Sequence, residues 1–586
     1  MEGWLKKMNK TVTALTRIGA MVICTMMIVS GSAVYAAGPG GEMPGPGGDM
    51  SGSGGGQPGG TSSSVTWTGS KTITGKTTES GKTYSSTNAG ENAVLIDTSE
   101  AVTLKNSTVT KTGGTSAGDS ESFYGTNSAI MCKGGGTTTI TGANITTDAA
   151  GANGVFSYGG NASTNASSGD GTTVKISDST ITTTGNGSGG IMTTGQGTTE
   201  AENLKITTSG ASSAAIRSDR GGGVVNVTGG SYKTSGVGSP AVYATATVTV
   251  NNATLTSTAS QGIVNEGGNK VYINNCTLNA GNSTLNSQDY FRNGIFLYQS
   301  MSGDASDGAS VFTMKGGSLN NTYGHVFHVT NTSAAITLDD VDINNSDSDN
   351  VFLSVCDDAW SGLANKATLN ATDQIINGDI LVGSDSTANI NLSGSSVWTG
   401  RTNGKITSHK DSSTVSTSLG TVNVKLSDDA VWVLTGDCSV SSISGSGKIN
   451  YNGYILTVGN KSYSSGSPGV NTITETSESG SQEKADQNLK VSKVTRTVKY
   501  NSLKKKTQTV KGVAVSNAKG TVTYSISEVS KKSFRKYFSI NSTTGKVTVK
   551  KGLKKGTYKI TVKVNAAATK KYKADAGTAV LTVKVR

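Results

Sequence analysis

The stretch Val248-Thr249-Val250-Asn251-Asn252-Ala253-Thr254-Leu255 reads as a short strand, a two-residue bend and a second short strand. Its apolar residues Val250 and Leu255 lie five positions apart, and Asn252 follows the first of them by two. Asparagine, aspartate and glycine adopt the left-handed backbone conformation more readily than other residues, whose side chains clash there. The stretch therefore predicts a corner that turns the chain sharply without reversing it into a hairpin.

The same pattern recurs along the chain with the same internal spacing. The other apolar pairs are Leu104/Val109, Ile140/Ile145, Ile176/Ile181, Val227/Tyr232, Ile273/Leu278, Met314/Leu319 and Leu338/Ile343. The bend residues, Asn252 included, are Asn106, Gly142, Asp178, Gly229, Asn252, Asn275, Gly316 and Asp340. Self-similarity at a period of roughly 20 to 50 residues is typical of a solenoid, in which each coil buries its inward side chains against its neighbours.

A second recurring pattern supplies another strand for each coil. Short apolar runs such as Ala93–Ile96, Gly154–Phe156 and Gly294–Phe296 recur about every 29 residues. A sandwich or barrel would instead place Asn-Gly or Asp-Gly pairs between alternating strands. We therefore predict a right-handed parallel β-helix over residues 63–463, with three strands in each coil.

The composition fits a thin, repetitive core. Only 34% of the 586 residues are hydrophobic and 5% are aromatic, which is low for a compact globular domain. Disorder is the alternative for such a composition. The periodic spacing of the apolar residues argues against it, because a solenoid needs apolar residues only at inward strand positions.

The N-terminal segment is typical of export. Lys6, Lys7 and Lys10 precede an apolar run, residues 18–29, which is too short to span a membrane, and Val34-Tyr35-Ala36 offers a small-residue cleavage site. We predict a signal peptide over 1–36, a Gly/Pro-rich linker over 37–62, no transmembrane segment in the mature chain, and secretion to the cell surface of a bacterium. Cys132, Cys276, Cys356 and Cys438 show no paired spacing, which favours neither a zinc site nor a disulfide framework.

A different module is predicted after a polar linker over 464–490. Residues 491–586 contain alternating segments such as Tyr558–Val564 and Ala579–Val585, which indicate a small antiparallel β-sandwich. They hold about 24 lysines and arginines against two acids, a net charge near +22 within an overall +12, so the preceding residues carry about −10. Outside a cell, this charge favours an anionic cell-wall polymer as partner rather than nucleic acid.

Two family resemblances extend this interpretation. The repeat block, through phrases such as 122–129, 221–230 and 298–305, resembles the right-handed parallel β-helix, or pectin-lyase-like, superfamily, in particular adhesin-like surface proteins of bacteria. The tail segment 537–549 is similar to Ig-like or cadherin-like modules, without the acidic calcium-binding linkers of cadherins. The resemblance implies the fold, but superfolds host many activities.

Candidate binding chemistry is sparse. Arg217, Asp219 and Arg220 end one of the third strands and could bind an acidic glycan or serve a lyase, or simply form a surface salt bridge. Asp342, Asp347 and Asp349 could stack and hold Ca²⁺, the one cofactor that we consider. His325 and His328 are expected on opposite faces of a strand and therefore unable to share a metal.

Three functions remain open. We expect a non-catalytic adhesin-like protein that binds an extracellular polysaccharide or cell-surface glycan. The alternatives are a pectate-lyase-like polysaccharide lyase and a purely structural surface rod. Because the corner residues are explained by backbone geometry, any ligand site should lie on the variable loops, around residues 217–220, 289–293 and 299–307.

Overall fold

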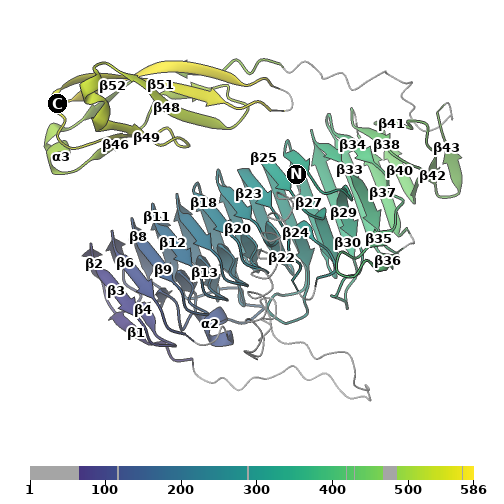
Figure 1. Cartoon of the computed structure of the whole chain (residues 1–586), viewed down its shortest axis with the longest axis horizontal. Coiled ribbons are helices and arrows are strands. Elements are labelled where there is room, and N and C mark those ends of the chain that lie inside the picture. The colour runs from purple at the N-terminus through teal and green to yellow at the C-terminus, as the bar shows by residue number, and fades with distance from the viewer. Residues whose placement is uncertain are drawn as a thin grey trace, which may run out of the picture. The chain divides into compact units, whose positions relative to one another are not determined.

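The computed structural model describes residues 65–114, 118–286, 289–416, 419–427, 429–465, 485–569 and 572–586. The predicted signal peptide and first linker lie outside these residues, as does most of the second linker. The regular secondary structure of the described chain is almost entirely β-strand, and most of the strands lie in large parallel sheets (Figure 1). No described helix is long and apolar enough to cross a membrane.

One parallel sheet collects the predicted third strands in chain order. Its twelve strands within the described chain are β1 (Gly69–Ile73), β4 (Asn92–Asp97), β7 (Ile130–Lys133), β10 (Val155–Tyr158), β13 (Ile191–Thr194), β16 (Ile216–Ser218), β19 (Val242–Ala244), β22 (Ile263–Glu266), β24 (Asn293–Tyr298), β26 (His325–Thr330), β29 (Val351–Val355) and β32 (Asp379–Val382). Each strand pairs with the strand one coil away. We call this sheet A.

The strands on either side of the corners form a second large parallel sheet, sheet B. Its strands before each corner are β2 (Thr77–Ser80), β5 (Val102–Lys105), β8 (Thr137–Thr141), β11 (Thr173–Ser177), β14 (Gly197–Glu202), β17 (Gly223–Thr228), β20 (Thr247–Asn251), β27 (Ser333–Asp339), β30 (Lys366–Thr372), β33 (Thr387–Ser393) and β37 (Thr421–Leu426). Those after a corner are β3 (Thr83–Ser86), β6 (Thr108–Lys111), β9 (Asn144–Thr147), β12 (Thr180–Thr183), β15 (Lys205–Thr208), β18 (Ser231–Thr234), β21 (Thr254–Ser257) and β28 (Asp342–Asn345). The continuous strands β23 (Lys270–Ala280) and β25 (Ala309–Asn321) contain their corners, and β40 (Ser442–Gly445) completes the sheet.

All eight predicted corner residues have positive φ angles. Asn252 has φ +55°, Asp340 +51° and Gly316 +60°. Their neighbours keep the chain in register: β20 pairs with β17 and β23, and β21 pairs with β18 and β23. The inward residues Val250 and Leu255 are fully buried in one continuous apolar core. Stacked coils of this kind fit the predicted parallel β-helix.

The last coils use smaller sheets. Strands β31 (Ile375–Asn377), β34 (Val397–Gly400), β38 (Val431–Leu434) and β41 (Lys448–Asn450) form one parallel sheet. The remaining strands here are β35 (Ile406–Thr407), β36 (Thr414–Ser416), β39 (Cys438–Val440), β42 (Leu456–Val458) and β43 (Lys461–Tyr463). Trp398 and Trp432 stack in the core, with ring centroids 4.4 Å apart and an interplanar angle of 4°. These two tryptophans are therefore core residues.

The C-terminal segment forms its own strands around its own apolar core. One sheet has the order β45 (Val494–Val498), β52 (Asp575–Val585), β51 (Gly556–Ala566) and β48 (Val522–Val529); another contains β46 (Gln508–Val510), β50 (Val547–Val549) and β49 (Phe538–Ile540). Strands β44 (Lys490–Ser492) and β47 (Ala514–Ser516), helix α3 (Tyr500–Lys505) and the 3₁₀ helix η1 (Lys532–Tyr537) complete it. Because β45 pairs with β52 in parallel, the expectation of purely antiparallel pairing is wrong. The Ig-like identity of this module remains a prediction.

Candidate functional site

From β4 onward, the outer face of sheet A is buried rather than exposed to solvent. Every residue of β13, β24 and β26 is buried, although only alternate residues of each strand point into the coil. In-register stacking aligns one outward residue from each coil into a row: Met192, Arg217, Tyr243, Val264, Phe296 and His328. Side chains from loop segments cover this row, so the candidate site is built between the sheet and its loops.

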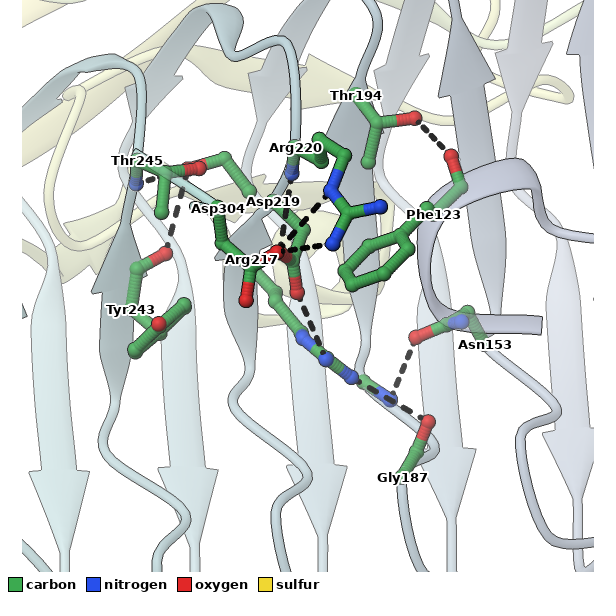
Figure 2. Close-up of polar contacts among 12 residues, drawn as sticks. Phe123, Asn153, Gly187, Thr194, Arg217, Asp219, Arg220, Tyr243, Thr245 and Asp304 are labelled. Atoms are coloured by element: carbon green, nitrogen blue, oxygen red, sulfur yellow. Dashed lines mark hydrogen bonds and ion pairs between the residues drawn. The ribbon is translucent and has the colours of Figure 1, made fainter. Parts of the chain in front are cut away.

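Arg217 and Asp219 form a buried ion pair. The Arg217 Nη2 and Asp219 Oδ2 atoms are 3.0 Å apart, and the side chains are only 3% and 0% exposed. Arg217 Nη1 also donates to the Gly187 carbonyl (Figure 2). Burial raises the pKa of Asp219, while the Arg217 guanidinium opposes this. The expectation of a surface salt bridge is therefore wrong, because loops cover this end of the strand.

Arg220 joins two of the predicted loops. Its Nε and Nη2 atoms both donate to Asp304 Oδ1, at 3.1 and 2.7 Å. Its guanidinium also lies over the ring of Phe123, 4.0 Å from the centroid, and Phe123 belongs to helix α2 (Asp119–Tyr124) (Figure 2). The structure thus brings the 217–220 and 299–307 segments together, although they belong to coils that are not adjacent.

A buried carboxylate, Glu266, continues this polar network. Tyr243 Oη and Tyr298 Oη donate to Glu266 Oε2, and Ser300 Oγ donates to Glu266 Oε1. Burial raises the pKa of Glu266, and the hydroxyl of Ser300 is the first of the groups that oppose this. Sequence analysis missed Glu266, because a lone acid inside an apolar strand carries no recognisable motif.

An aromatic hollow lies directly beside this network. It is lined by Gly238, Pro240, Tyr243, Gln261, Val264, Asn286, Asp289, Phe296, Tyr298, Ser300 and Trp360. Its cavity volume is about 40 Å³. That is room for about three ordered waters. The hollow can therefore take the edge of a small ring or a pendant group, not a buried polymer chain.

The hollow offers ring faces and a few hydrogen-bonding groups. Phe296 and Tyr298 stack with centroids 4.4 Å apart, and Tyr298 lies 5.3 Å from Trp360. Gln261 Nε2 donates to Asp289 Oδ2 at 3.0 Å. Burial, and then the Asp358 carboxylate, raise the pKa of Asp289 to about 7. Trp360 Nε1 is buried and has no hydrogen-bond partner among the described residues.

All three histidines of the chain gather next to this hollow. His325 Nδ1 and His328 Nδ1 both lie 2.7 Å from Ser354 Oγ, so the expectation that they point to opposite faces is wrong. His409 comes from a distant loop, and its ring centroid lies 5.1 Å from that of His325. Strict alternation fails because His325 is the first residue of β26, where the chain has only just entered the strand.

This histidine cluster fastens the loops that form the hollow. His328 Nε2 lies 3.1 Å from Asp358 Oδ2, and Asp358 Oδ1 accepts from the backbone N–H of Tyr290. His409 Nδ1 accepts from the backbone N–H of Arg292. The segments that carry Asp289 and Trp360 are therefore held to β26 by one connected network. Among the described residues, no group of His, Cys, Asp or Glu is arranged to hold a metal ion.

The acidic candidates for calcium are used in local hydrogen bonds. Asp342 is exposed on β28. Asp347 accepts from the backbone N–H of Gly324 and Asp349, and Asp349 Oδ2 lies 3.2 Å from His409 Nε2. Nothing in the described chain draws the three carboxylates into one cation site. Cys132, Cys276, Cys356 and Cys438 are free and buried, and burial raises the pKa of the Cys276 thiol.

Comparison with known proteins adds little. No protein-family model matches the chain, and a search of curated proteins found no match. Among solved structures, the extracellular domain of protocadherin gamma-B4 is similar over a short region, with 14% sequence identity and a TM-score of 0.15. The similarity covers 18% of each chain, so this chain spans less than a fifth of that relative. A TM-score this low supports no conclusion about fold or function.

Proposed function

We propose that this chain is an exported, adhesin-like bacterial surface protein of the pectin-lyase-like β-helix type. In this proposal it binds a glycan at the aromatic hollow without cleaving it. The observation that carries the proposal is the hollow itself, where Tyr298 and Trp360 offer ring faces beside the hydrogen-bonding groups of Gln261 and Asp289. Aromatic faces with a few fixed polar groups are the usual composition of a small-ligand site.

Binding without cleavage is favoured over lyase chemistry by the state of the arginines. A lyase needs a base that reaches the substrate, and the candidate Arg217 is buried and paired with Asp219. Arg220 is paired with Asp304. No lysine or arginine is among the described residues that line the hollow. These pairings give both arginines a structural role in holding the loops that surround the site.

The experiment combines a binding screen with a product assay on the full-length chain. The protein is applied to a glycan array and, separately, incubated with polygalacturonate and Ca²⁺. We expect binding to at least one glycan class and no unsaturated product. Trp360→Ala should abolish that binding, whereas Trp67→Ala, at an aromatic cluster on another part of sheet A, should leave it intact. Steady release of unsaturated product would favour the lyase, and an absence of glycan binding would favour a purely structural rod.

The basic C-terminal module completes the proposal. Its net charge near +22 supports attachment to an anionic cell-wall polymer. In the proposed arrangement, the module holds the protein at the cell surface while the stacked coils present the hollow.

A further inference from the structure

The aromatic hollow has a distinct electrostatic character, which bears on the class of glycan that it takes. Asp289 is the one carboxylic acid among the described lining residues, and it is only 4% exposed. Glu266 lies directly behind the wall formed by Tyr243 and Tyr298, to which it is hydrogen-bonded. No cationic side chain lines the hollow in the described chain to offset these acids.

The two arginines of the network are already paired, and Lys410 lies near enough to Asp289 to oppose the rise in its pKa. Arg220 donates two hydrogen bonds to the carboxylate of Asp304. Arg217 donates one to the carboxylate of Asp219. Around Glu266 there are thus three buried carboxylates and two arginines, an excess of one acid. Since charges interact strongly where little water is present, an incoming carboxylate would meet repulsion that no described lining side chain relieves.

The indole of Trp360 adds a specific requirement. Its Nε1–H is buried without a partner in the described chain, although buried donors are nearly always hydrogen-bonded. A ligand oxygen that entered beside the edge of the indole would satisfy it. The carboxylate of Asp289, by contrast, accepts hydrogen bonds and already receives one from Gln261. Trp360 thus offers a donor to a ligand, and Asp289 offers an acceptor.

We propose that the hollow binds the edge of a neutral sugar, with a hydroxyl oxygen accepting from Trp360 Nε1 and a hydroxyl group donating to Asp289, and that it excludes uronates. This inference rests on the proposed function, since it specifies the ligand of the same site. The proposal also distinguishes this chain from enzymes that act on acidic glycans. Such an enzyme must bind the carboxylate of its substrate, whereas this hollow is lined by a carboxylate of the protein, that of Asp289.

The test uses the full-length chain and matched oligosaccharides. Neutral hexose oligomers and their C6-oxidised uronate counterparts are titrated calorimetrically at low salt and at pH 8, where Asp289 is ionised. We expect the uronates to bind at least tenfold more weakly than the neutral forms. Asp289→Asn should reduce that gap to threefold or less, whereas Asp307→Asn, in an exposed loop, should leave it unchanged.

A second variant separates the two hydrogen bonds. Trp360→Phe keeps an aromatic ring but removes the N–H, so neutral-sugar affinity should fall at least fivefold with no change in the discrimination against uronates. Equal or tighter binding of uronates to the wild-type chain would overturn the inference while leaving glycan binding intact. Failure of the wild-type chain to bind any glycan would instead overturn the proposed function.

Discussion

At the scale of single residues, the buried Arg217–Asp219 pair loses the hydration of two charges and gains their mutual attraction. Each charge loses its hydration on burial, and the pair is stable because the guanidinium and carboxylate meet at 3.0 Å and use further backbone groups. Removing one partner leaves the other charged and uncompensated. Replacing both by apolar side chains avoids that penalty.

This argument predicts the behaviour of two variants. Arg217→Met should lower the free energy of unfolding by about 3 kcal/mol, because Asp219 then faces only other acids. The double variant Arg217→Met/Asp219→Leu should lose less than the single variant and should keep glycan binding. Urea unfolding of the full-length chain measures the first effect and calorimetry the second. Loss of glycan binding in a folded double variant would show that the pair contacts the ligand.

The corner residues show what can be predicted at this scale. The sequence pattern identified eight corners, and further ones occur at Gly81, Asn203, Asp373 and Gly394, all with positive φ. Some of these escaped notice because the first inward position is not a large apolar residue; it is Ala201 before Asn203 and Ala371 before Asp373. The preference of glycine, asparagine and aspartate for a positive φ angle is a local property, so it can be predicted from the sequence. Which small residues are buried depends on packing between coils and cannot be predicted in this way.

At the scale of elements, the histidine cluster links the strands of sheet A to the loops that cover them. His325 packs on Phe291 and contacts Ser354, and it faces His328 and His409, which in turn contact Asp358 and Asp349. Burial, then the neighbouring His409 and His328, lower the pKa of His325 well below its ordinary value. The folded protein therefore holds His325 neutral at pH values where the unfolded chain protonates it.

A pH dependence of stability follows from this shift. The contribution of His325 is fully present above its unfolded pKa, about 6.5, and is lost as the pH falls below that value. Its loss amounts to at most about 2 kcal/mol by pH 5. Asp219 and Asp289 act in the opposite sense, because their raised pKa values favour the folded state as the pH falls. The comparison of wild type with His325→Gln isolates the histidine.

The measurement is urea unfolding of both full-length proteins at pH 7.5, 6 and 5. Between pH 7.5 and 5, His325→Gln should lose less stability than the wild-type chain. If the free energy of unfolding of the two proteins changed equally with pH, His325 would not be held neutral in the fold.

The elements also mark where prediction from sequence ends. Inward residues recur with the strand period and were recognised, whereas the outward row from Met192 to His328 is buried only because loops fold back over it. No local sequence pattern predicts that loops cover this row of residues. The loops at 289–293 and 299–307 were expected to surround a ligand site, but the contributions of Glu266, Trp360 and the histidine cluster depend on contacts across several coils.

At the scale of the whole molecule, the charge is divided unevenly along the chain. The last 96 residues carry about +22 and the rest about −10. If the basic module binds an anionic wall polymer, the full-length protein should associate with teichoic-acid-containing cell walls, and binding should fall steeply between low and physiological salt. Walls stripped of teichoic acid serve as the control. Binding that does not depend on salt would contradict an electrostatic attachment.

The central claim is that a glycan binds in the aromatic hollow on the outer side of sheet A. Hydrogen–deuterium exchange on the full-length chain, with and without a saturating neutral oligosaccharide from the array, tests it most directly. We predict that added protection is concentrated in peptides containing Tyr243, Phe296–Ser300 and Trp360, and is absent from sheet B. Protection elsewhere, with these peptides unchanged while the glycan is bound, would contradict the claim.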